Sequence, residues 1–394
     1  MSDLIVRVAA RGDGITADGR HAAFAAPGDT LTADDAIIPG PHHQVPPCRH
    51  FPVCGGCQLQ HLDDESYAGF LVDRIAGALA AQRLEAPIRP PALSPPRTRR
   101  RATLHAEAKG GALQLGFSEQ ASHAIVDLRE CWILTPSLFA LVGPLRKLLA
   151  RALKGRGRIQ LTELDQGIDV LVEGKLAEDL ATAEAITAFC GANNIARFAI
   201  DDGIGPETRW EPEAVTITLS GVAVPFPAGS FLQATREGEA ALVAAVREAV
   251  GAATVSADLF AGLGTFALSL PGKVYAAEAG RDAILALKAG AAQAERAVFA
   301  EHRDLFRRPL ATAECDRFAA IVLDPPRAGA KEQVAQLTSA RVPVIAYVSC
   351  NPSSFARDAE ILCKGGYTLD WVQPVGQFRW STHAELAARF SRQG

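Results

Sequence analysis

In the second half of the chain, short apolar runs alternate with longer stretches of helical periodicity. A short apolar run is typical of a strand buried on both faces of a parallel sheet, because helices cover both faces. The run from Arg236 to Val250 is an Ala-rich amphipathic pattern that ends at Gly251 and predicts a helix. We therefore predict a doubly wound α/β domain over residues 226–394, with strands at 255–260, 274–277, 319–323 and 342–348.

The first half of the chain has a different pattern. Residues 1–46 contain several glycines that indicate turns, and this pattern predicts a small β unit. Residues 47–225 mix helical and strand patterns and predict a central α+β region. Its expected elements are helices at 63–84, 135–153 and 177–193, strands at 102–108 and 113–117 joined by a Gly110-Gly111 turn, and a hairpin over 159–173.

Composition and charge fit a soluble multidomain protein. The chain has 394 residues, of which 48% are hydrophobic and 21% charged. Residues 1–14 contain no long apolar stretch, so we expect no signal peptide, no membrane association and a cytoplasmic location. The net charge of −4 does not indicate nucleic-acid binding, but a local basic run lies at 97–101.

A glycine-containing turn follows the first predicted strand of the α/β domain. Gly262 and Gly264 lie between the strand ending in Asp258-Leu259-Phe260 and a helical pattern. Glu278 closes the next strand, 20 residues after Asp258, a distance that suits bonding to ribose hydroxyls. No third glycine of a dinucleotide fingerprint is present, so the turn favours a ligand such as S-adenosylmethionine. The alternative is a turn that only packs a helix on a strand.

Two further predicted strands end in groups that carry chemistry. Asp324 precedes Pro325-Pro326, and Cys350 directly follows the apolar run at 342–348. Residues at the carboxyl ends of parallel strands line the ligand crevice, so the Cys350 thiol occupies an active-site position. Glu385 follows 35 residues later as a candidate base. The alternatives are an inert buried thiol and a solvated glutamate at a helix start.

The chain has eight cysteines, and three of them cluster at Cys48, Cys54 and Cys57. With Cys131 they supply four thiolates, which can bind zinc or an iron–sulfur cluster, and spacing alone does not choose. We interpret Cys190, Cys315 and Cys363 as structural.

Taken in order, these motifs resemble those of RNA uridine-5 methyltransferases. They are the glycine turn, Asp-Pro-Pro-Arg-x-Gly at 324–329, Ser-Cys-Asn-Pro at 349–352 and His-x-Glu at 383–385. The segments 99–104, 125–131 and 231–233 extend the resemblance, which is to the bacterial 23S rRNA branch that carries an iron–sulfur cluster. Three features depart from the family: Thr235 replaces an Asn, Gly376-Gln377-Phe378-Arg379 replaces Asp-x-Phe-Pro, and the N-terminal TRAM-like unit is short.

The resemblance implies a class I S-adenosylmethionine methyltransferase of Rossmann-like fold, a monomer acting on RNA, most specifically 23S rRNA. Cys350 would add to carbon 6 of uracil, and Glu385 would remove the proton from carbon 5, with His383 the next candidate base. The other implied sites are cofactor binding by Gln233, Asp258, Gly262, Gly264, Glu278, Asp304 and Asp324, a 4Fe–4S cluster on Cys48, Cys54, Cys57 and Cys131, and RNA contacts by Arg97, Arg99, Arg100, Arg101 and Phe231.

Alternative functions remain open from the residues. A tRNA uridine-5 methyltransferase would share the chemistry and differ in substrate. A non-catalytic iron–sulfur protein that binds RNA or senses redox state would need neither Cys350 nor Glu385. Amino-methylating enzymes place an aromatic residue where Arg327 stands, and cytosine-5 RNA enzymes place a second cysteine after the Asp-x-Pro motif, which this chain lacks.

Overall fold

The structure is a computed structural model that describes residues 3–109 and 112–392. The expected Gly110-Gly111 turn lies outside these residues. Two compact units are present: residues 1–70, 94–215 and 378–382 form the first, and residues 71–93, 216–377 and 383–394 form the second. The division into three domains at 46/47 and 225/226 stays a prediction.

The N-terminal residues form the expected small β unit. Its five strands are antiparallel and lie in the order β3-β2-β1-β4-β5. Ile5, Ala22, Ala25 and Leu31 make its small apolar core. The strands are β1 (Asp3–Val8), β2 (Gly14–Thr16), β3 (His21–Ala22), β4 (Thr30–Leu31) and β5 (Ile37–Ile38).

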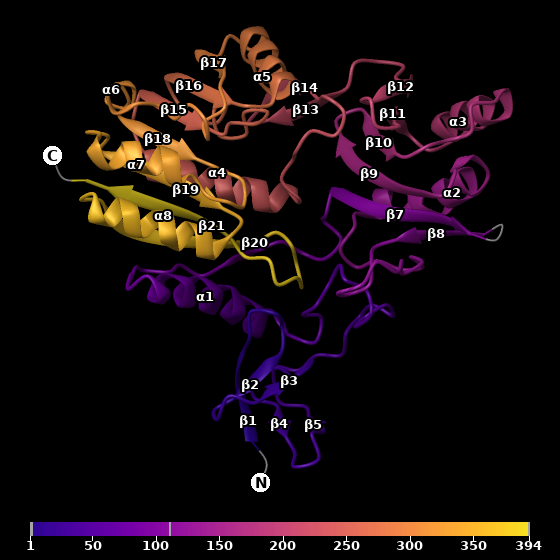
Figure 1. The fold of residues 1–394 in the computed structure, drawn as a ribbon, viewed down its shortest axis with the longest axis horizontal. Helices are drawn as coiled ribbons and strands as arrows, with labels where there is room; N and C mark the ends of the chain where they lie inside the picture. Colours follow the sequence, from indigo (N-terminus) through magenta and orange to yellow (C-terminus); the bar gives the residue numbers. More distant parts are fainter. Residues whose placement is uncertain (1–2, 110–111, 393–394) are drawn as a thin grey trace. The chain divides into compact units, whose positions relative to one another are not determined.

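The central region is built on a six-stranded sheet in the order β12-β11-β10-β9-β7-β8. Two helices pack side by side against it (Figure 1). Each helix begins at a side-chain cap, because Thr135 accepts a hydrogen bond from the N–H of Leu138 and Asp179 accepts one from that of Thr182. The elements are β7 (Arg101–Lys109), β8 (Ala112–Gly116), α2 (Pro136–Ala152), β9 (Arg156–Leu164), β10 (Gly167–Glu173), α3 (Leu180–Ala192), β11 (Ile195–Asp201) and β12 (Glu207–Trp210).

The second unit is built on an eight-stranded sheet in the order β17-β16-β15-β18-β19-β21-β20-β6. The five neighbouring strands β17, β16, β15, β18 and β19 are parallel to one another. Strand β21 is antiparallel to both β19 and β20. The strands are β6 (Ala92–Leu93), β15 (Val255–Leu259), β16 (Lys273–Glu278), β17 (Val298–His302), β18 (Ala320–Leu323), β19 (Val344–Ser349), β20 (Thr368–Gly376) and β21 (Glu385–Ser391).

Helices cover both faces of this sheet (Figure 1). Helices α7 and α8 pack on one face in a core that includes Ile321, Ile345 and Tyr347. Helix α4 contacts β18, β19 and β21 and contributes no residue to that core, so it covers the other face. The helices are α4 (Arg236–Val250), α5 (Arg281–Gln293), α6 (Thr312–Cys315), α7 (Lys331–Ser339) and α8 (Pro352–Lys364), preceded by the hairpin of β13 (Thr216–Leu219) and β14 (Val222–Pro225).

The predicted α/β architecture is confirmed, with one correction to its local detail. Strands β15, β16, β18 and β19 and helix α4 stand where the sequence predicted them. Glu385 opens strand β21, so the alternative that placed it at a helix start is wrong.

Helix α1 (Asp64–Ala81) begins after Asp63, whose carboxylate accepts the N–H of Ser66 at 2.8 Å. Among the described helices, none combines the length and apolarity needed to cross a membrane.

Candidate active site and cysteine pocket

The carboxyl ends of β15, β16, β18 and β19 meet at one edge of the second unit's sheet. The parallel register pairs Leu259 with Leu323 and Leu323 with Tyr347, so these strands end side by side. Glu278 ends β16, Asp324 directly follows β18, and Cys350 directly follows β19. The structure therefore brings together the acidic groups and the thiol that the sequence placed at strand ends.

The glycine turn after β15 needs its two glycines for different reasons. Gly264 has φ +94°, and a Cβ on it would lie 2.3 Å from Cδ1 of Leu287 in α5. Gly262 has φ +53°, and nothing lies within 4 Å of its Cβ position. Gly264 therefore lets helix α5 pack closely, whereas the backbone at Gly262 faces open space where a ligand can approach.

Hydrogen bonds tie the nearby carboxylates to this turn. Glu278 accepts the N–H of Gly262 at 2.9 Å and that of Gly280 at 2.6 Å. Asp258 is fully buried, and one of its oxygens accepts the N–H of Ala267 at 2.7 Å, while the other has no hydrogen-bond partner. Asp258 thus fixes the segment after the glycine turn from inside the sheet.

Two acidic side chains at this edge have a raised pKa, chiefly because they are buried. Burial raises the pKa of Asp258 to about 8, and Asp324 and Glu278 add to the rise. Burial, with the charge of Glu278, raises the pKa of Asp324 to about 7. Because like charges at short range disfavour ionisation, a cation placed here would restore the charged carboxylates. The edge is therefore matched to a positively charged ligand.

Strands β19 and β21 bring Cys350 and Glu385 to adjacent positions. Their antiparallel register pairs Ser349 with Leu386, and the next pair in that register is Cys350 with Glu385. Burial raises the pKa of the Cys350 thiol, and the charges of Glu385 and Asp324 raise it further. Glu385 is only 6% exposed, and burial raises the pKa of its carboxyl to about 8. The thiol of Cys350 and the carboxyl of Glu385 thus lie near enough for their charges to interact.

One residue that the sequence did not assign to the site contacts this base. Gln377 follows β20, and its side-chain N–H group donates to Glu385 and, at 2.6 Å, to the side-chain oxygen of Gln233. The oxygen of Gln377 accepts the N–H of Ala234 at 2.8 Å. Gln377 stands at the variable position of the family segment Asp-x-Phe-Pro, so no local pattern in the sequence indicated a role for it.

Several predicted site residues have local structural roles. Thr235, which stands in place of the family's Asn, caps α4 by accepting the N–H of Gly238 at 2.9 Å. Asp304 accepts the N–H groups of Phe306 at 3.0 Å and Arg307 at 3.3 Å in the turn after β17. Phe231 is 61% exposed.

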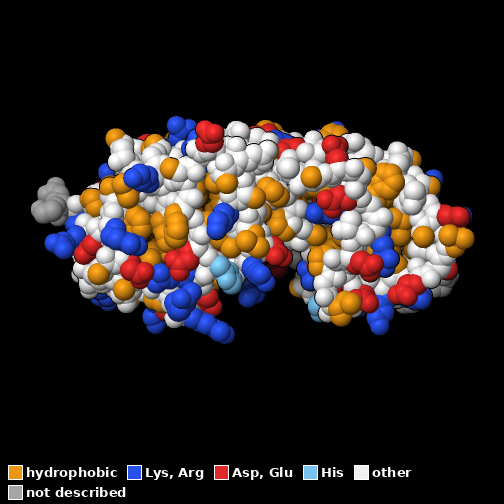
Figure 2. Space-filling model, turned by 90° about the horizontal axis from the view of Figure 1, so that it is seen from above, with side chains coloured by type: hydrophobic (Ala, Val, Ile, Leu, Met, Phe, Trp, Pro, Cys, Tyr) orange, Lys and Arg blue, Asp and Glu red, His pale blue; other side chains and the backbone are white. Residues whose placement is uncertain are grey.

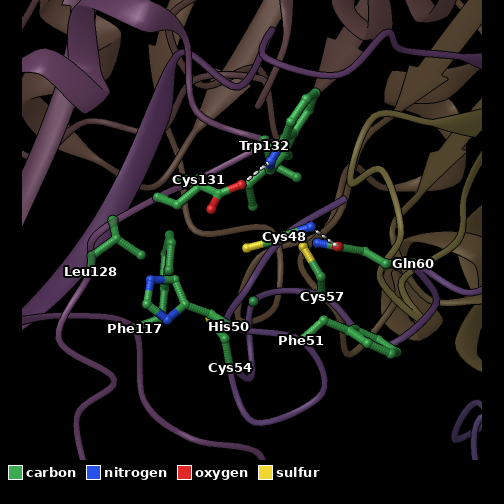
Figure 3. A pocket seen from close by; sticks show the side chains of 13 residues that line it. Cys48, His50, Phe51, Cys54, Cys57, Gln60, Phe117, Leu128, Cys131 and Trp132 are labelled. Carbon is green, nitrogen blue, oxygen red and sulfur yellow. Dashed lines mark hydrogen bonds between the residues drawn. The ribbon is translucent and has the colours of Figure 1, made fainter. Parts of the chain in front are cut away.

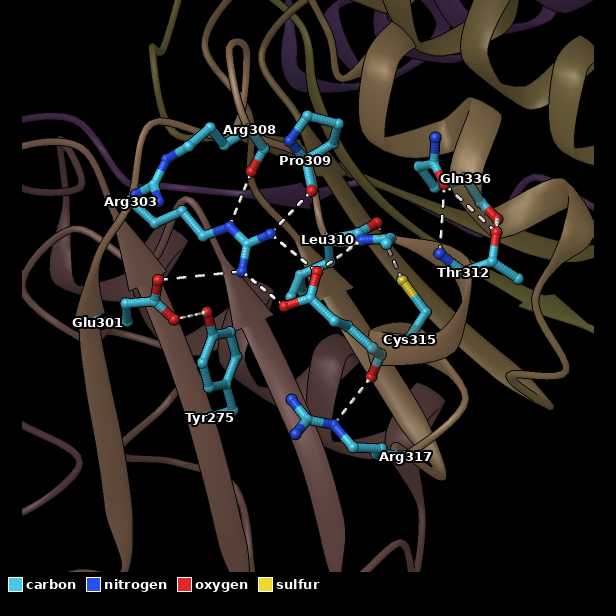
Figure 4. A network of polar contacts seen from close by, with 12 residues as sticks. Tyr275, Glu301, Arg303, Arg308, Pro309, Leu310, Thr312, Cys315, Arg317 and Gln336 are labelled. Carbon is cyan, nitrogen blue, oxygen red and sulfur yellow. Dashed lines mark hydrogen bonds and ion pairs between the residues drawn. The ribbon is translucent and has the colours of Figure 1, made fainter.

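A polar network holds the segment that contains Asp304 (Figure 4). The guanidinium group of Arg303 donates to both carboxylate oxygens of Glu314 at 2.9 Å and to the carbonyl of Pro309 at 2.9 Å. The hydrogen bonds from Arg303 lower the pKa of Glu314 to about 2. Tyr275 donates to Glu301 at 2.5 Å in the same network. The ion pair between Arg303 and Glu314 joins α6 to the end of β17 and keeps the turn after β17 in place.

The four cysteines expected to hold a metal line a single pocket in the first unit (Figure 3). None of them forms a disulfide. No group of three or more His, Cys, Asp or Glu side chains in the described ranges is arranged to hold a metal ion. The pocket is lined by Cys48, His50, Phe51, Cys54, Gly56, Cys57, Gln60, Phe117, Leu128, Glu130, Cys131, Trp132 and Ile133.

Glycine allows the loop of this pocket to approach a neighbouring segment. The N–H of Gly55 donates to the carbonyl of Ser118 at 2.9 Å, and a Cβ on Gly55 would lie 2.8 Å from that same oxygen. Burial raises the pKa of Cys57 to about 12 and that of Cys131 to about 11. These thiols are therefore protonated at neutral pH in the metal-free chain, and a metal would displace their protons.

The basic run at 97–101 divides into exposed and buried parts. Arg97 is exposed and stacks 4.2 Å above the Trp132 ring. Burial lowers the pKa of Arg99, and the nearby Cys57 and Cys131 oppose that shift. Arg100 is only 1% exposed, and its contact with RNA stays a prediction. On the face in Figure 2, Lys and Arg are interspersed with acidic and hydrophobic side chains.

The fold and the edge define a class of protein. A parallel sheet with a glycine turn after its first strand and an acidic residue ending the second is the arrangement of class I S-adenosylmethionine-dependent methyltransferases. The crystal structure of Pyrococcus abyssi tRNA (uracil-54, C5)-methyltransferase in complex with S-adenosyl-L-homocysteine shares this fold. Its TM-score is 0.77 at 22% sequence identity, covering 99% of each chain.

The sequence relatives identify the family. Residues 282–393 match the family profile described as tRNA (Uracil-5-)-methyltransferase. An uncharacterized RNA methyltransferase of Zymomonas mobilis is 52% identical, over 98% of this chain and 99% of the relative. The 23S rRNA (uracil(1939)-C(5))-methyltransferase RlmD of Halomonas elongata is 31% identical, over 91% of this chain and 78% of the relative. The chain therefore belongs to the RNA uracil-5-methyltransferase family, an enzyme family that uses S-adenosylmethionine.

Proposed function

We propose that this enzyme methylates carbon 5 of a uridine in 23S rRNA through a covalent bond between Cys350 and carbon 6 of the uracil. The observation that carries the mechanism is the β19–β21 register, which sets Cys350 opposite Glu385 at the acidic sheet edge. The relative RlmD, similar along 91% of the chain, supports the choice of 23S rRNA over tRNA.

Cys350 makes carbon 5 of the ring reactive. This carbon is a poor nucleophile in free uracil. When the thiolate of Cys350 adds to carbon 6, the electron pair of the carbon 5–carbon 6 double bond moves toward the carbonyl at carbon 4 and forms an enolate. Carbon 5 then forms a bond to the methyl group. S-adenosylmethionine, when bound, would supply that methyl group from its sulfonium, and the sulfur–methyl bond would break to leave S-adenosylhomocysteine.

Glu385 completes the reaction by removing a proton. After methyl transfer, carbon 5 carries both its original hydrogen and the new methyl group. The Glu385 carboxylate takes the proton, the double bond re-forms, and Cys350 leaves as a thiolate. A base at this position needs a pKa near neutrality, and burial raises that of Glu385 to about 8.

The acidic edge supplies the cofactor site in this proposal. Glu278, held at the glycine turn by Gly262, would bond the ribose hydroxyls. The half-buried Asp324 would face the cationic part of the cofactor, consistent with its raised pKa. The other residues assigned to this site are Gln233, Asp258, Gly264 and Asp304.

The RNA would meet groups at the surface of the chain. Arg97, exposed beside Trp132, and the half-buried Arg101 would contact phosphates. The exposed ring of Phe231 would stack on a base. The target uridine must leave its stack to reach Cys350.

We further propose that Cys48, Cys54, Cys57 and Cys131 bind a 4Fe–4S cluster. Four thiols in one pocket provide the ligand type and number of such a cluster. The nearby guanidinium of Arg99 would offset the negative charge of a thiolate-bound cluster.

Replacement of the nucleophile tests the proposed activity. Cys350→Ala should bind S-adenosylmethionine normally, because the glycine turn is unchanged. Transfer of labelled methyl to RNA should fall on the order of 10³-fold or more. Cys363→Ala, which removes a half-buried thiol from α8, is the matched control and should retain activity. Appreciable turnover by Cys350→Ala would contradict the covalent mechanism.

The substrate is tested separately. Mapping 5-methyluridine in the rRNA and tRNA of a strain that lacks this protein should show a loss at one 23S rRNA position. A loss confined to tRNA would establish the tRNA alternative and leave the chemistry unchanged.

A further inference from the structure

Gln377 connects residues 233–235 to Glu385, which lies about 150 residues later in the sequence. Its side chain is 2% exposed. Its oxygen accepts the backbone N–H of Ala234 at 2.8 Å and that of Thr235 at 3.4 Å. Its nitrogen donates to Gln233 at 2.6 Å and to Glu385. Both the oxygen and the nitrogen of the Gln377 amide therefore form hydrogen bonds beside Glu385.

These partners fix the orientation of the Gln377 amide. A backbone N–H can only donate, so the atom facing Ala234 must be the oxygen. The nitrogen then points toward Glu385, whose carboxylate can only accept. The same logic extends to Gln233, whose oxygen receives the Gln377 hydrogen bond. The amide nitrogen of Gln233 is consequently at the end turned away from Gln377.

We propose that Gln377 is a positioning residue, which orients the Glu385 carboxylate toward the uracil bound at Cys350 and stabilises its ionised form. The inference rests on the proposed role of Glu385 as the base. A donor at a buried carboxylate opposes the cost of ionising it there. The hydrogen bond from Gln377 opposes the rise in the pKa of Glu385 that burial and Asp324 cause, as does the charge of Arg327.

The second contact of Gln377 links Glu385 to Gln233, which the sequence assigned to the cofactor site. The oxygen of Gln233 accepts that hydrogen bond at 2.6 Å. Gln377 thus holds Glu385 and Gln233 together within the second unit.

The proposal predicts how removal of the donor affects one step of the reaction. Gln377→Met keeps the length of the side chain and removes its hydrogen bonds. The profile of adduct resolution against pH should move upward by about one unit, so resolution at pH 7 should slow about tenfold. Covalent protein–RNA adduct should accumulate at pH 7 and clear at pH 9. Gln373→Met, in the preceding strand β20 and bonded to the Pro90 and Pro374 carbonyls, should match the wild type.

Two further variants separate the possible failures. If Gln377→Met cannot bind cofactor, Gln377→Glu keeps the side-chain volume and places a second carboxylate beside Glu385, which must also move the profile upward. A wild-type profile for the variant that binds cofactor would contradict the positioning role. If Glu385→Gln itself formed no adduct with RNA, the proposed function would fail instead. An adduct in Glu385→Gln with an unmoved Gln377→Met profile would refute only the role of Gln377.

Discussion

The acidic sheet edge and the cysteine pocket both gather ionisable groups, but they do so by different structural means. At the edge, Glu278, Asp324 and Cys350 follow directly from the ends of parallel strands. In the pocket, Cys48, Cys54 and Cys57 come from an irregular loop and meet Cys131 from a distant segment. Regular strands position the groups of the edge, whereas the cysteine loop depends on the close approach that Gly55 allows and on burial.

The two regions share the cause of their raised pKa values. Burial is the largest cause for Asp258 and Asp324 at the edge and for Cys57 and Cys131 in the pocket, and neighbouring ionisable groups add to the rise in both. The comparison teaches that regular strands and an irregular loop can create the same kind of electrostatic environment.

If the edge and the pocket have separate functions, a substitution in the pocket should leave the function of the edge intact. Cys57→Ala should abolish cluster binding, so iron in protein purified without oxygen should fall from about four per chain toward zero. Affinity for S-adenosylmethionine should stay within about twofold, because its residues lie in the second unit. Metal analysis and calorimetric titration measure these two outcomes. Stoichiometric zinc without iron in the wild type would overturn the cluster assignment.

The charge of Asp324 provides a second test of the comparison between the edge and the pocket. Asp324→Asn should weaken S-adenosylmethionine binding by about tenfold or more, because an amide cannot offset a positive charge. In the wild type, affinity should fall as the pH drops below about 7, because burial and Glu278 raise the pKa of Asp324 to about 7 and protonation then removes its charge. Titrations between pH 6 and pH 8.5 test both effects. Affinity that is independent of pH in this range would exclude Asp324 from the site.

The glycine turn offers a smaller and more local test. Gly264→Ala should destabilise the second unit by about 1–3 kcal/mol, because the new Cβ would meet Leu287 and φ is +94°. Gly262→Ala has open space around its Cβ and should cost only about 1 kcal/mol. It should weaken cofactor binding more than Gly264→Ala does. Denaturant melts and titrations of the two variants compare stability with binding.

The sequence predicted the regular parts of this fold because apolar runs identify buried strands. It did not predict β20 or β21. Strand β21 contains Glu385 and Arg389, and its burial comes from pairing between β19 and β20 rather than from its own pattern. Strand β20 contains Pro374 and Asp370, which break the apolar pattern.

The site was predictable where a residue stands at a strand end and not where tertiary contacts define its role. Cys350 and Asp324 lie at the expected edge. Gln377 gains its position only because 233–235 and Glu385 come together around it. Arg100 shares a basic run with Arg97, yet only the fold shows that its side chain is buried.

The central claim is tested most directly by trapping the intermediate. Glu385→Gln has the same shape and an oxygen that can still accept from Gln377, but an amide cannot remove the carbon 5 proton. Incubated with RNA and labelled S-adenosylmethionine, this variant should form a protein–RNA adduct that carries the methyl label and survives denaturing electrophoresis. The adduct should be absent from the double variant Cys350→Ala/Glu385→Gln. Normal turnover by Glu385→Gln without an adduct would contradict the account and would direct attention to His383 as the base.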